Sequence, residues 1–213
     1  MKLDFDQCKW INRPEHYQVS ENRISLTTSP HTDFWQRTFY GFRNDNAPAL
    51  LFSQNENFSL TTRVSFAYRN LFDQCGLVIY LDSENWFKAS IEYENSSFAR
   101  LGSVVTNFGF SDWATTDIPL PTEIWYRLSR RHADFLIEYS LDGNEFKQMR
   151  IFRLHSLPEG SEAEYFGKVS LLSKQAIDVG FYACSPTDSR FEARFSDIQF
   201  GPSIWSAHGD ESA

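Results

Sequence analysis

Apolar and polar residues alternate one by one along most of this chain, which is the period of a β-strand that buries one face. The alternation predicts strands over residues 58–66, 87–93, 125–129, 135–140, 168–172, 176–182 and 191–200. A convincing helical period is absent, and a short helical turn over 161–166 is the nearest approach to one. Many short strands at a spacing of about 8–12 residues are typical of antiparallel sandwiches and barrels. We therefore expect an all-β protein.

Turn-forming residues separate these runs where an antiparallel sheet needs them. Asp142-Gly143 stands between two alternating runs, which is the strongest short signal of a hairpin. The sequence Asp-Ser-Glu-Asn over 82–85 favours a second turn immediately before Trp86. Neighbouring strands are therefore expected to pair as hairpins.

The segment from residue 86 to 93 shows how the alternation divides side chains between two faces of a sheet. One set is apolar and is expected in the core: Phe87, Ala89, Ile91 and Tyr93. The other set points away from the core: Trp86, Lys88, Ser90 and Glu92.

A second strand repeats this division. Trp125, Arg127 and Ser129 share one face, and Tyr126 and Leu128 share the apolar one. Three further residues are candidates for the same outward position: Tyr80, Glu138 and Tyr182.

Aromatic rings among Lys, Arg and Glu on an outward face have two interpretations. A plain solvated face, which antiparallel sheets commonly have, accounts for the pattern equally well. The functional interpretation is a shallow groove for a polyhydroxylated ligand. Apolar sugar faces stack on rings, while charged and amide groups bind hydroxyls.

Length and composition fit one domain with its own core. The 213 residues contain no Pro/Ser/Gly linker, charge block or internal repeat. We expect a single domain over 1–205 and a tail over 206–213. The aromatic share is 16%, which suits wide, half-buried pleated surfaces.

Charge and cysteine usage narrow the function classes. The formal net charge of −8 without a basic stripe argues against nucleic-acid binding. The basic cluster over 127–132 is interpreted as a strand end. No apolar run approaches the roughly 18 residues of a membrane span, and the first ten residues have no apolar core of a signal peptide. Cys8, Cys75 and Cys184 lie far apart, so reduced, mostly buried thiols and a cytoplasmic location are expected.

Several blocks of this sequence together resemble one family of concanavalin A-like proteins of unknown function, which includes a yeast protein named for regulation of enolase. The blocks are His31–Phe42, Asp73–Tyr93, Ser103–Thr106, Ser111–Trp113, Trp125–Leu128, Tyr139–Gly143, Val179–Pro186 and Phe191–Phe195. They cover the chain from about Trp10 to Phe200. A more distant resemblance is to the C-terminal accessory domain of some β-xylosidases.

The resemblance implies a jelly-roll sandwich of two curved antiparallel sheets, as in legume lectins and several glucanases. It implies no firm activity. The family pattern does match positions that alternation had placed opposite the core, and it adds Asp112 and Trp113. It also matches the polar and aromatic cluster His31, Asp33, Trp35 and Tyr40, which otherwise is interpreted as a buried network.

The sequence gives weaker signals for cofactor binding, metal binding and catalysis. No His-x-His, Cys-x-x-Cys or Gly-rich phosphate loop is present, so no cofactor is expected. Asp33, Asp45 or Asp112 could hold a loop calcium as in lectin relatives, although turn capping by these carboxylates is preferred. A glycosidase needs two carboxyls about 5–9.5 Å apart. Glu92 and Glu94 come nearest to such a pair, but Glu94 opens a turn.

Three functions therefore stay open. The first is a non-catalytic, intracellular lectin-like module that binds a carbohydrate or sugar-phosphate in a groove on the concave sheet. Its predicted ligand-binding residues are Trp86, Lys88, Glu92, Asp112, Trp113, Arg127, His31, Asp33, Trp35 and Tyr40. The second is a regulatory protein that docks on a metabolic enzyme. The third is a glycoside-active enzyme that uses Glu92.

Overall fold

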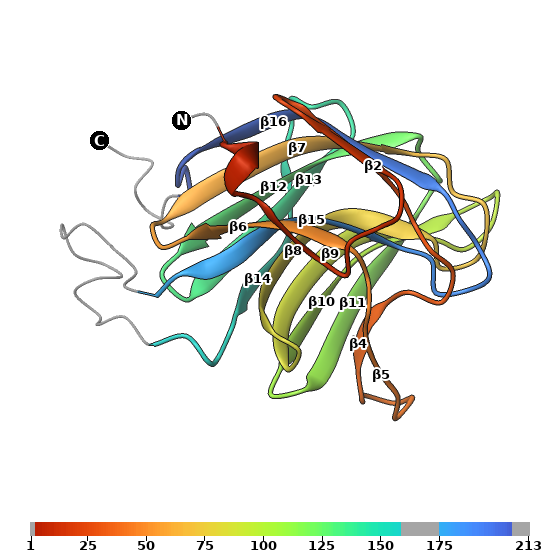
Figure 1. The fold of residues 1–213 in the computed structure, drawn as a ribbon, viewed down its shortest axis with the longest axis horizontal. Coiled ribbons are helices and arrows are strands. Elements are labelled where there is room, and N and C mark those ends of the chain that lie inside the picture. Colours follow the sequence, from red (N-terminus) through yellow and green to blue (C-terminus); the bar gives the residue numbers. More distant parts are fainter. Residues whose placement is uncertain (1–2, 159–174, 206–213) are drawn as a thin grey trace.

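The computed structural model describes residues 3–158 and 175–205 (Figure 1). The strand predicted over 168–172, the helical turn predicted over 161–166 and the predicted tail lie outside these residues. The described chain forms two large sheets and one small one, and every pairing between named strands is antiparallel (Figure 1). The prediction of an all-β protein is confirmed.

Sheet A carries the site described below. Its strands, in spatial order, are β1 (Lys9–Ile11), β6 (Ala49–Gln54), β15 (Ile177–Cys184), β8 (Gln74–Asp82), β9 (Asn85–Tyr93), β10 (Ala99–Asn107) and β11 (Phe110–Ile118). β15 lies between β6 and β8, so a strand from late in the chain completes the middle of this sheet (Figure 1).

Sheet B packs against sheet A. Its strands, in spatial order, are β14 (Lys147–Arg153), β13 (Asp134–Ser140), β12 (Glu123–Arg131), β7 (Phe58–Phe66), β16 (Glu192–Pro202), β3 (Arg23–Thr27) and β2 (Tyr17–Ser20). Here β16 lies between β7 and β3. A short 3-10 helix, η1 (Phe5–Gln7), precedes β1.

Both predicted turns connect antiparallel neighbours. The Asp82 carboxylate accepts the backbone N–H of Glu84 between β8 and β9. The Asp142 carboxylate accepts the backbone N–H groups of Asn144 and Glu145 between β13 and β14. This second loop runs from residue 141 to 146, so it is longer than a two-residue hairpin turn.

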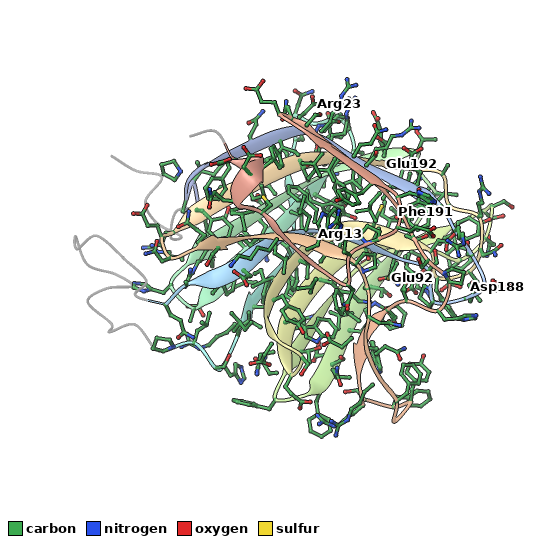
Figure 2. The ribbon with its side chains drawn as sticks, viewed as in Figure 1. Arg13, Arg23, Glu92, Asp188, Phe191 and Glu192 are labelled. Atoms are coloured by element: carbon green, nitrogen blue, oxygen red, sulfur yellow. The ribbon has the colours of Figure 1, made fainter. Side chains whose placement is uncertain are left out.

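The main core lies between the inner faces of the two sheets, which are the faces turned toward each other. Phe87, Ala89 and Ile91 point into it from β9, as alternation predicted. Phe181 on β15 meets Phe195 on β16 across the layer, with ring centroids 5.2 Å apart. Side chains fill this layer densely (Figure 2). Burying one such aliphatic or aromatic side chain stabilises the fold by about 1.5–3 kcal/mol.

A second core covers part of the outer face of sheet A, which is the face turned away from sheet B. The small sheet formed by β4 (Phe34–Gln36) and β5 (Arg43–Asp45) lies over this face and buries it. The buried residues of this second core are Phe34, Trp35, Ala47, Ala49, Leu51, Val78, Trp86, Val104, Tyr182 and Cys184. Sheet A is therefore dry on both faces here, although most antiparallel sheets keep one face in water.

Arg37, at the tip of this covering hairpin, bonds the hairpin to two turns of sheet A. Arg37 donates from Nη1 and Nη2 to the two carboxylate oxygens of Glu84, at 2.8 and 3.1 Å. The same Nη1 donates to the backbone carbonyl of Gly109 at 2.7 Å. Glu84 lies in the β8–β9 turn and Gly109 in the β10–β11 turn, so one side chain joins three loops. Paired, charge-assisted bonds of this kind fix geometry as well as adding stability.

Cys75 and Cys184 are buried and Cys8 is half-buried, and all three thiols are free. Among the residues described, none of the helical segments has the length and apolarity to cross a membrane.

Candidate functional site

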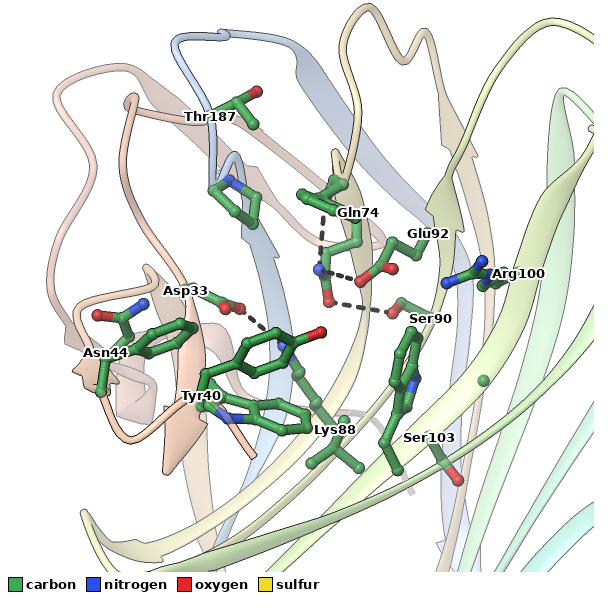
Figure 3. A pocket seen from close by; sticks show the side chains of 17 residues that line it. Asp33, Tyr40, Asn44, Gln74, Lys88, Ser90, Glu92, Arg100, Ser103 and Thr187 are labelled. Atoms are coloured by element: carbon green, nitrogen blue, oxygen red, sulfur yellow. Dashed lines mark hydrogen bonds and ion pairs between the residues drawn. The ribbon is translucent and has the colours of Figure 1, made fainter. Parts of the chain in front are cut away.

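A cavity of about 370 Å³ opens on the outer face of sheet A, beside the second core (Figure 3). We call it the first cavity. Strands β8, β9 and β10 form its floor, and the β4–β5 hairpin forms one wall. Trp113 on β11 also lines the cavity, next to Trp35 of this hairpin. Its volume lies at the lower end of the range of about 300–1,000 Å³ that is usual for small-molecule sites.

Strand register arranges the floor as three rows that cross β8, β9 and β10. The rows are Gln74, Glu92, Arg100; then Gly76, Ser90, Gly102; then Val78, Lys88, Val104. Rows two residues apart lie about 6.5–7 Å apart and neighbouring strands about 4.8 Å apart. The three rows therefore span about 13–14 Å along the strands and about 10 Å across them, which is ample for a sugar ring.

The middle row is small, which makes the floor hollow. Ser90 lies between Gly76 and Gly102. A Cβ at Gly76 would lie 1.9 Å from the carbonyl oxygen of Ala89, so only glycine fits there. A Cβ at Gly102 would lie 3.2 Å from the indole nitrogen of Trp113, so the absence of a side chain lets this indole lean over the floor.

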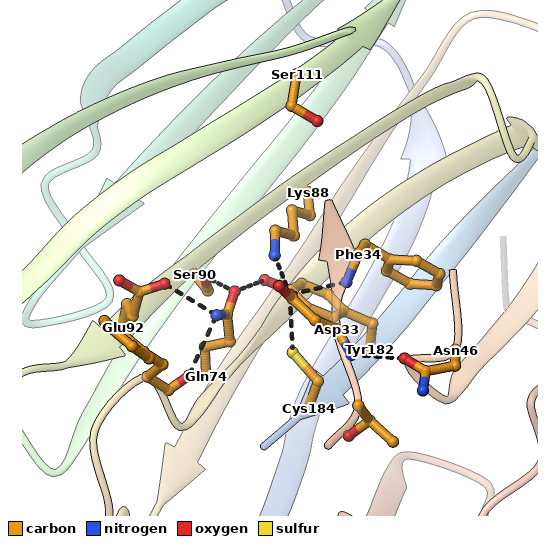
Figure 4. A network of polar contacts seen from close by, with 12 residues as sticks. Asp33, Phe34, Asn46, Gln74, Lys88, Ser90, Glu92, Ser111, Tyr182 and Cys184 are labelled. Carbon is orange, nitrogen blue, oxygen red and sulfur yellow. Dashed lines mark hydrogen bonds and ion pairs between the residues drawn. The ribbon is translucent and has the colours of Figure 1, made fainter. Parts of the chain in front are cut away.

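Lys88 occupies one end of the floor and forms a buried ion pair. Its Nζ donates to Oδ1 of Asp33 at 2.8 Å, and its side chain is 5% exposed (Figure 4). Burial alone would lower the pKa of Lys88, but the Asp33 carboxylate raises it above its ordinary value. Asp33 is held in turn by the backbone N–H of Phe34, at 2.8 Å. Within the described part of the chain, Asp33 is the one acceptor bonded to this ammonium, so Lys88 has two further N–H donors for a ligand.

Glu92 occupies the other end of the floor. Its Oε2 accepts from the side-chain Nε2 of Gln74 at 3.0 Å (Figures 3 and 4). Gln74 is fixed by its own bonds, because its Oε1 accepts from Tyr182 at 3.1 Å and from Ser90 at 3.4 Å. Burial raises the pKa of Glu92 from 4.5 to about 7, against the opposing effect of Lys88. This carboxyl is therefore able to donate or accept a hydrogen bond near neutral pH.

Aromatic rings form the upper walls. The Trp35 and Tyr40 rings lie 5.6 Å apart, and the Trp35 and Trp113 rings 6.4 Å apart, both edge to face. Phe42 stacks on Tyr40 at 5.3 Å. Trp113 is 37% exposed and Tyr40 55%, so both present ring surface to the opening. The Tyr40 hydroxyl points toward the space above Ser90 (Figure 3).

These groups suit recognition of a polyhydroxylated ring. The floor offers donors from Lys88 and acceptors or donors from Glu92 and Ser90, and the walls offer apolar ring surface. The charged side chains are mostly paired inside the protein. Lys88 bonds Asp33, and Arg100 bonds Glu94 at 2.9 Å.

The structure brings together six of the predicted site residues. All of them line the first cavity: Asp33, Trp35, Tyr40, Lys88, Glu92 and Trp113. Lys88 and Glu92 face outward from β9 together, as alternation predicted.

Arg127 does not join them, contrary to the prediction. It lies on β12 in sheet B, on the other side of the sandwich. There its guanidinium donates to both carboxylate oxygens of Glu138, at 2.6 and 2.7 Å, and covers the Phe146 ring.

Trp86 is also absent from the first cavity, contrary to the prediction. It faces outward from β9 as expected, but it is 0% exposed because Phe34 and the rest of the covering hairpin pack on it. It therefore belongs to the second core and offers no surface to a ligand.

Two further predicted residues lie outside the first cavity. His31 is exposed, with a left-handed φ of 58°, and its backbone carbonyl accepts from the Asn46 side chain. Asp112 pairs with Arg150 on β14. It is the direct neighbour of Trp113 on a strand, so the two side chains leave opposite faces.

Sequence reasoning missed several lining residues. They include Gln74, Arg100, Gly102, Val104 and Asn44. Strand register places Gln74, Arg100 and Gly102 in the cavity, because they lie beside Ser90 and Glu92 on the neighbouring strands. The alternation of Arg100, Gly102 and Val104 along β10 was the signal available in the sequence.

The three aspartates considered for a loop calcium each have a partner within the protein. Asp33 bonds Lys88, Asp45 accepts from the Tyr80 hydroxyl at 2.8 Å, and Asp112 pairs with Arg150. No group of three or more His, Cys, Asp or Glu side chains that could hold a metal ion occurs in residues 3–158 and 175–205.

Comparison with known proteins places this chain among relatives of undetermined activity. The profile of the family described as "Protein of unknown function (DUF1349)" matches residues 10–203. The yeast Saccharomyces cerevisiae protein named "Regulation of enolase protein 1" is 29% identical over 195 residues, which cover 91% of this chain and 89% of the yeast protein.

Two solved structures show the same architecture. A functionally unknown protein from Saccharomyces cerevisiae superposes with a TM-score of 0.80 at 27% identity, over 95% of this chain and 100% of that one. The GH43B protein of a Bacteroides ovatus xyloglucan PUL superposes with a TM-score of 0.66 at 16% identity, over 92% of this chain and 36% of the other. The second likeness concerns the fold alone, and it identifies the two sheets as a jelly-roll sandwich, as predicted.

Proposed function

This chain belongs to the family of proteins of unknown function DUF1349, and we propose that it is a non-catalytic, cytoplasmic, lectin-like module. Its ligand is a carbohydrate or a sugar-phosphate bound in the first cavity. The single observation that carries the proposal is the combination, in one cavity, of a polar floor with exposed aromatic walls. Protein sites for small molecules typically combine apolar lining with a few fixed polar groups.

Each part of the cavity has a role in this proposal. Trp113 and Tyr40 supply ring faces for the apolar side of a sugar. The free donors of Lys88 bind hydroxyl oxygens, and Glu92 binds hydroxyl hydrogens when it is ionised. Gln74 keeps Glu92 in place through the 3.0 Å bond, so the polar groups are already positioned before a ligand arrives.

Nuclear magnetic resonance titration tests the proposal. The probes are xylose, glucose and their β-1,4-linked di- and trisaccharides, because the solved structures of similar fold include proteins named for xyloglucan and for xylan β-1,4-xylosidase. We expect saturable shifts of the Trp113 indole N–H signal.

Two variants that make the same substitution, tryptophan to alanine, at different places show where the saccharide binds. Trp113→Ala removes one wall and is expected to abolish the shifts of other cavity residues. Trp125→Ala removes a half-buried indole from sheet B and is expected to leave them unchanged. If no saccharide produces saturable shifts, or if Trp125→Ala abolishes binding as Trp113→Ala does, the proposed function is wrong.

Hydrolysis by Glu92 is the less supported alternative. A glycosidase needs a second carboxyl that is free to act as nucleophile or base. The carboxylates whose charges act on Glu92 are Asp33 and Glu94. Each of them is bonded to a cation, Asp33 to Lys88 and Glu94 to Arg100. Chromatography of the trisaccharides after incubation with the protein tests this alternative, and we expect no cleavage.

Docking on a metabolic enzyme is the second candidate function. It is supported by the name of the yeast relative and by two exposed rings at the β10–β11 turn, Phe108 and Phe110, each 61% exposed. Exposed apolar patches often mark protein-binding surfaces. Sedimentation of the purified chain with purified enolase tests it. A complex that Phe108→Ala and Phe110→Ala weaken supports this candidate, and the absence of a complex contradicts it.

A further inference from the structure

A second cavity adjoins the first one. It encloses about 330 Å³ and is lined by Trp35, Thr38, Phe39, Tyr40, Ser111, Asp112 and Trp113. Three of these residues, Trp35, Tyr40 and Trp113, also line the first cavity. The two cavities therefore meet at a shared aromatic trio. A ligand that fills the first cavity and continues outward past these rings enters the second.

The loop that borders the second cavity is held in a costly conformation. Phe39 is 93% exposed and has a left-handed φ of 63°, and Arg37 has a left-handed φ of 54°. Such a conformation is a genuine outlier for a bulky residue, and it is energetically unfavourable. The Arg37 bonds to Glu84 and Gly109 maintain it. Neither the exposed ring of Phe39 nor its strained backbone stabilises the free protein. A role of this ring in ligand binding would explain both features.

The charges of the first cavity favour a neutral ligand. Lys88 and Arg100, its two cationic residues, are each paired with a carboxylate inside the protein. Glu92 faces Arg100 across the β9–β10 register, yet the structure has no ion pair for Glu92 among the residues it describes. A ligand phosphate or carboxylate would thus meet already neutralised cations and an ionisable acid. A neutral hydroxyl group avoids the cost of burying a negative charge without a cation to pair with it.

We propose that the ligand is a neutral oligosaccharide, with one sugar unit in the first cavity and the next unit in the second cavity. This inference rests on the proposed function and specifies its ligand class. The Tyr40 and Trp113 rings contact both units, and Phe39 contacts only the second. The exposed Thr38 offers a hydroxyl group to the second unit.

Chain-length dependence tests the inference. Dissociation constants are measured by titration for glucose, cellobiose and cellotriose, for the matching xylose series, and for glucose 6-phosphate. In the unmodified protein we expect the disaccharide to bind about tenfold tighter than the monosaccharide, which corresponds to about 1.4 kcal/mol. Glucose 6-phosphate is expected to bind no tighter than glucose.

A matched pair of variants locates the second unit. Phe39→Ala removes a ring that borders the second cavity, and Phe108→Ala removes a ring that borders neither cavity. Both phenylalanines are exposed and both have a left-handed φ, 63° and 52°. We expect Phe39→Ala to remove most of the tenfold gain without changing the affinity for the monosaccharide, and Phe108→Ala to preserve the gain.

The outcomes separate this inference from the proposed function. Equal affinity for mono- and disaccharides, or an unchanged gain in Phe39→Ala, overturns the second subsite while the function stands. Tighter binding of glucose 6-phosphate than of glucose overturns the neutral ligand class. Absence of binding by every saccharide overturns both the inference and the function.

Discussion

The protonation of Glu92 gives a prediction that follows directly from the floor of the first cavity. Burial raises its pKa from 4.5 to about 7 in the folded protein. The folded state thus holds a proton that the unfolded state releases between these two pH values. Stability falls as pH rises through this window, because the unfolded state binds fewer protons there. Below pH 4.5 both states are protonated and above about pH 7 both are ionised, so the contribution is level outside the window.

The magnitude follows from the same two values. The difference between 4.5 and about 7, at 1.36 kcal/mol for each pH unit, gives up to about 3 kcal/mol. Glu92→Gln removes the titration while its amide oxygen still accepts the Gln74 bond. The variant is therefore expected to gain stability relative to the unmodified protein as pH rises from about 4.5 to about 8, by up to about 3 kcal/mol.

Urea unfolding followed by tryptophan fluorescence at several pH values measures this difference. Glu56→Gln, which neutralises an exposed carboxylate in the β6–β7 loop, controls for the change in net charge. The carbon-13 signal of the Glu92 carboxyl gives its titration midpoint directly. A stability difference that stays constant across the window, or a midpoint below pH 5, refutes the assignment of a buried, protonated carboxyl.

Three further results are expected from the same unfolding and titration assays. Trp86→Ala empties the centre of the second core and costs about 3–5 kcal/mol; a loss below about 1 kcal/mol would mean that the hairpin does not bury this indole. Asp33→Ala leaves the Lys88 ammonium buried without its partner and costs about 3–5 kcal/mol, and adding Lys88→Met recovers part of this loss; the prediction fails if the two effects simply add. Arg127→Ala breaks the bonds to Glu138 and costs about 1.5–3 kcal/mol, whereas saccharide affinity is unchanged; weaker saccharide binding contradicts its position on sheet B.

Strand geometry made part of the site predictable. The side chains of Lys88 and Glu92 point the same way because the alternation of a strand is local and depends on nothing beyond the strand itself. The same argument correctly assigned Phe87 and Ile91 to the main core. These assignments needed neither the partner strands nor the rest of the fold.

Relations between strands were not predictable in this way. Alternation assigned Arg127 to an outward face, but it does not specify which of the two sheets that face belongs to. Asp112 and Trp113 were predicted together on the strength of a family pattern, although direct neighbours on a strand leave opposite faces. The row Gly76, Ser90 and Gly102 exists only in the register of three strands, so no single segment reveals it.

The misplacement of Trp86 has a different cause. Its outward position was predicted correctly, but the hairpin that covers it comes from a segment about 50 residues earlier in the chain. The outer face of sheet A also contains Val78 and Val104, and apolar residues at such positions indicate that something covers them. That signal was present in the sequence, but Val78 and Val104 lie beside Lys88 in the register, so it indicates a cover over sheet A without separating Trp86 from Lys88.

The positions of β15 and β16 in the middle of their sheets affect how this chain folds while it is being translated. When β14 leaves the ribosome, sheet A still lacks the strand that joins β6 to β8, and sheet B lacks the strand that joins β7 to β3. A nascent chain that ends before residue 177 therefore holds halves of two sheets with exposed edges, which invite wrong pairing. Folding is expected to wait until translation has passed residue 202, and to be slow, because β15 and β16 both pair with strands from much earlier in the chain. Removal of the β16 segment would thus abolish the whole fold rather than shorten it by one strand.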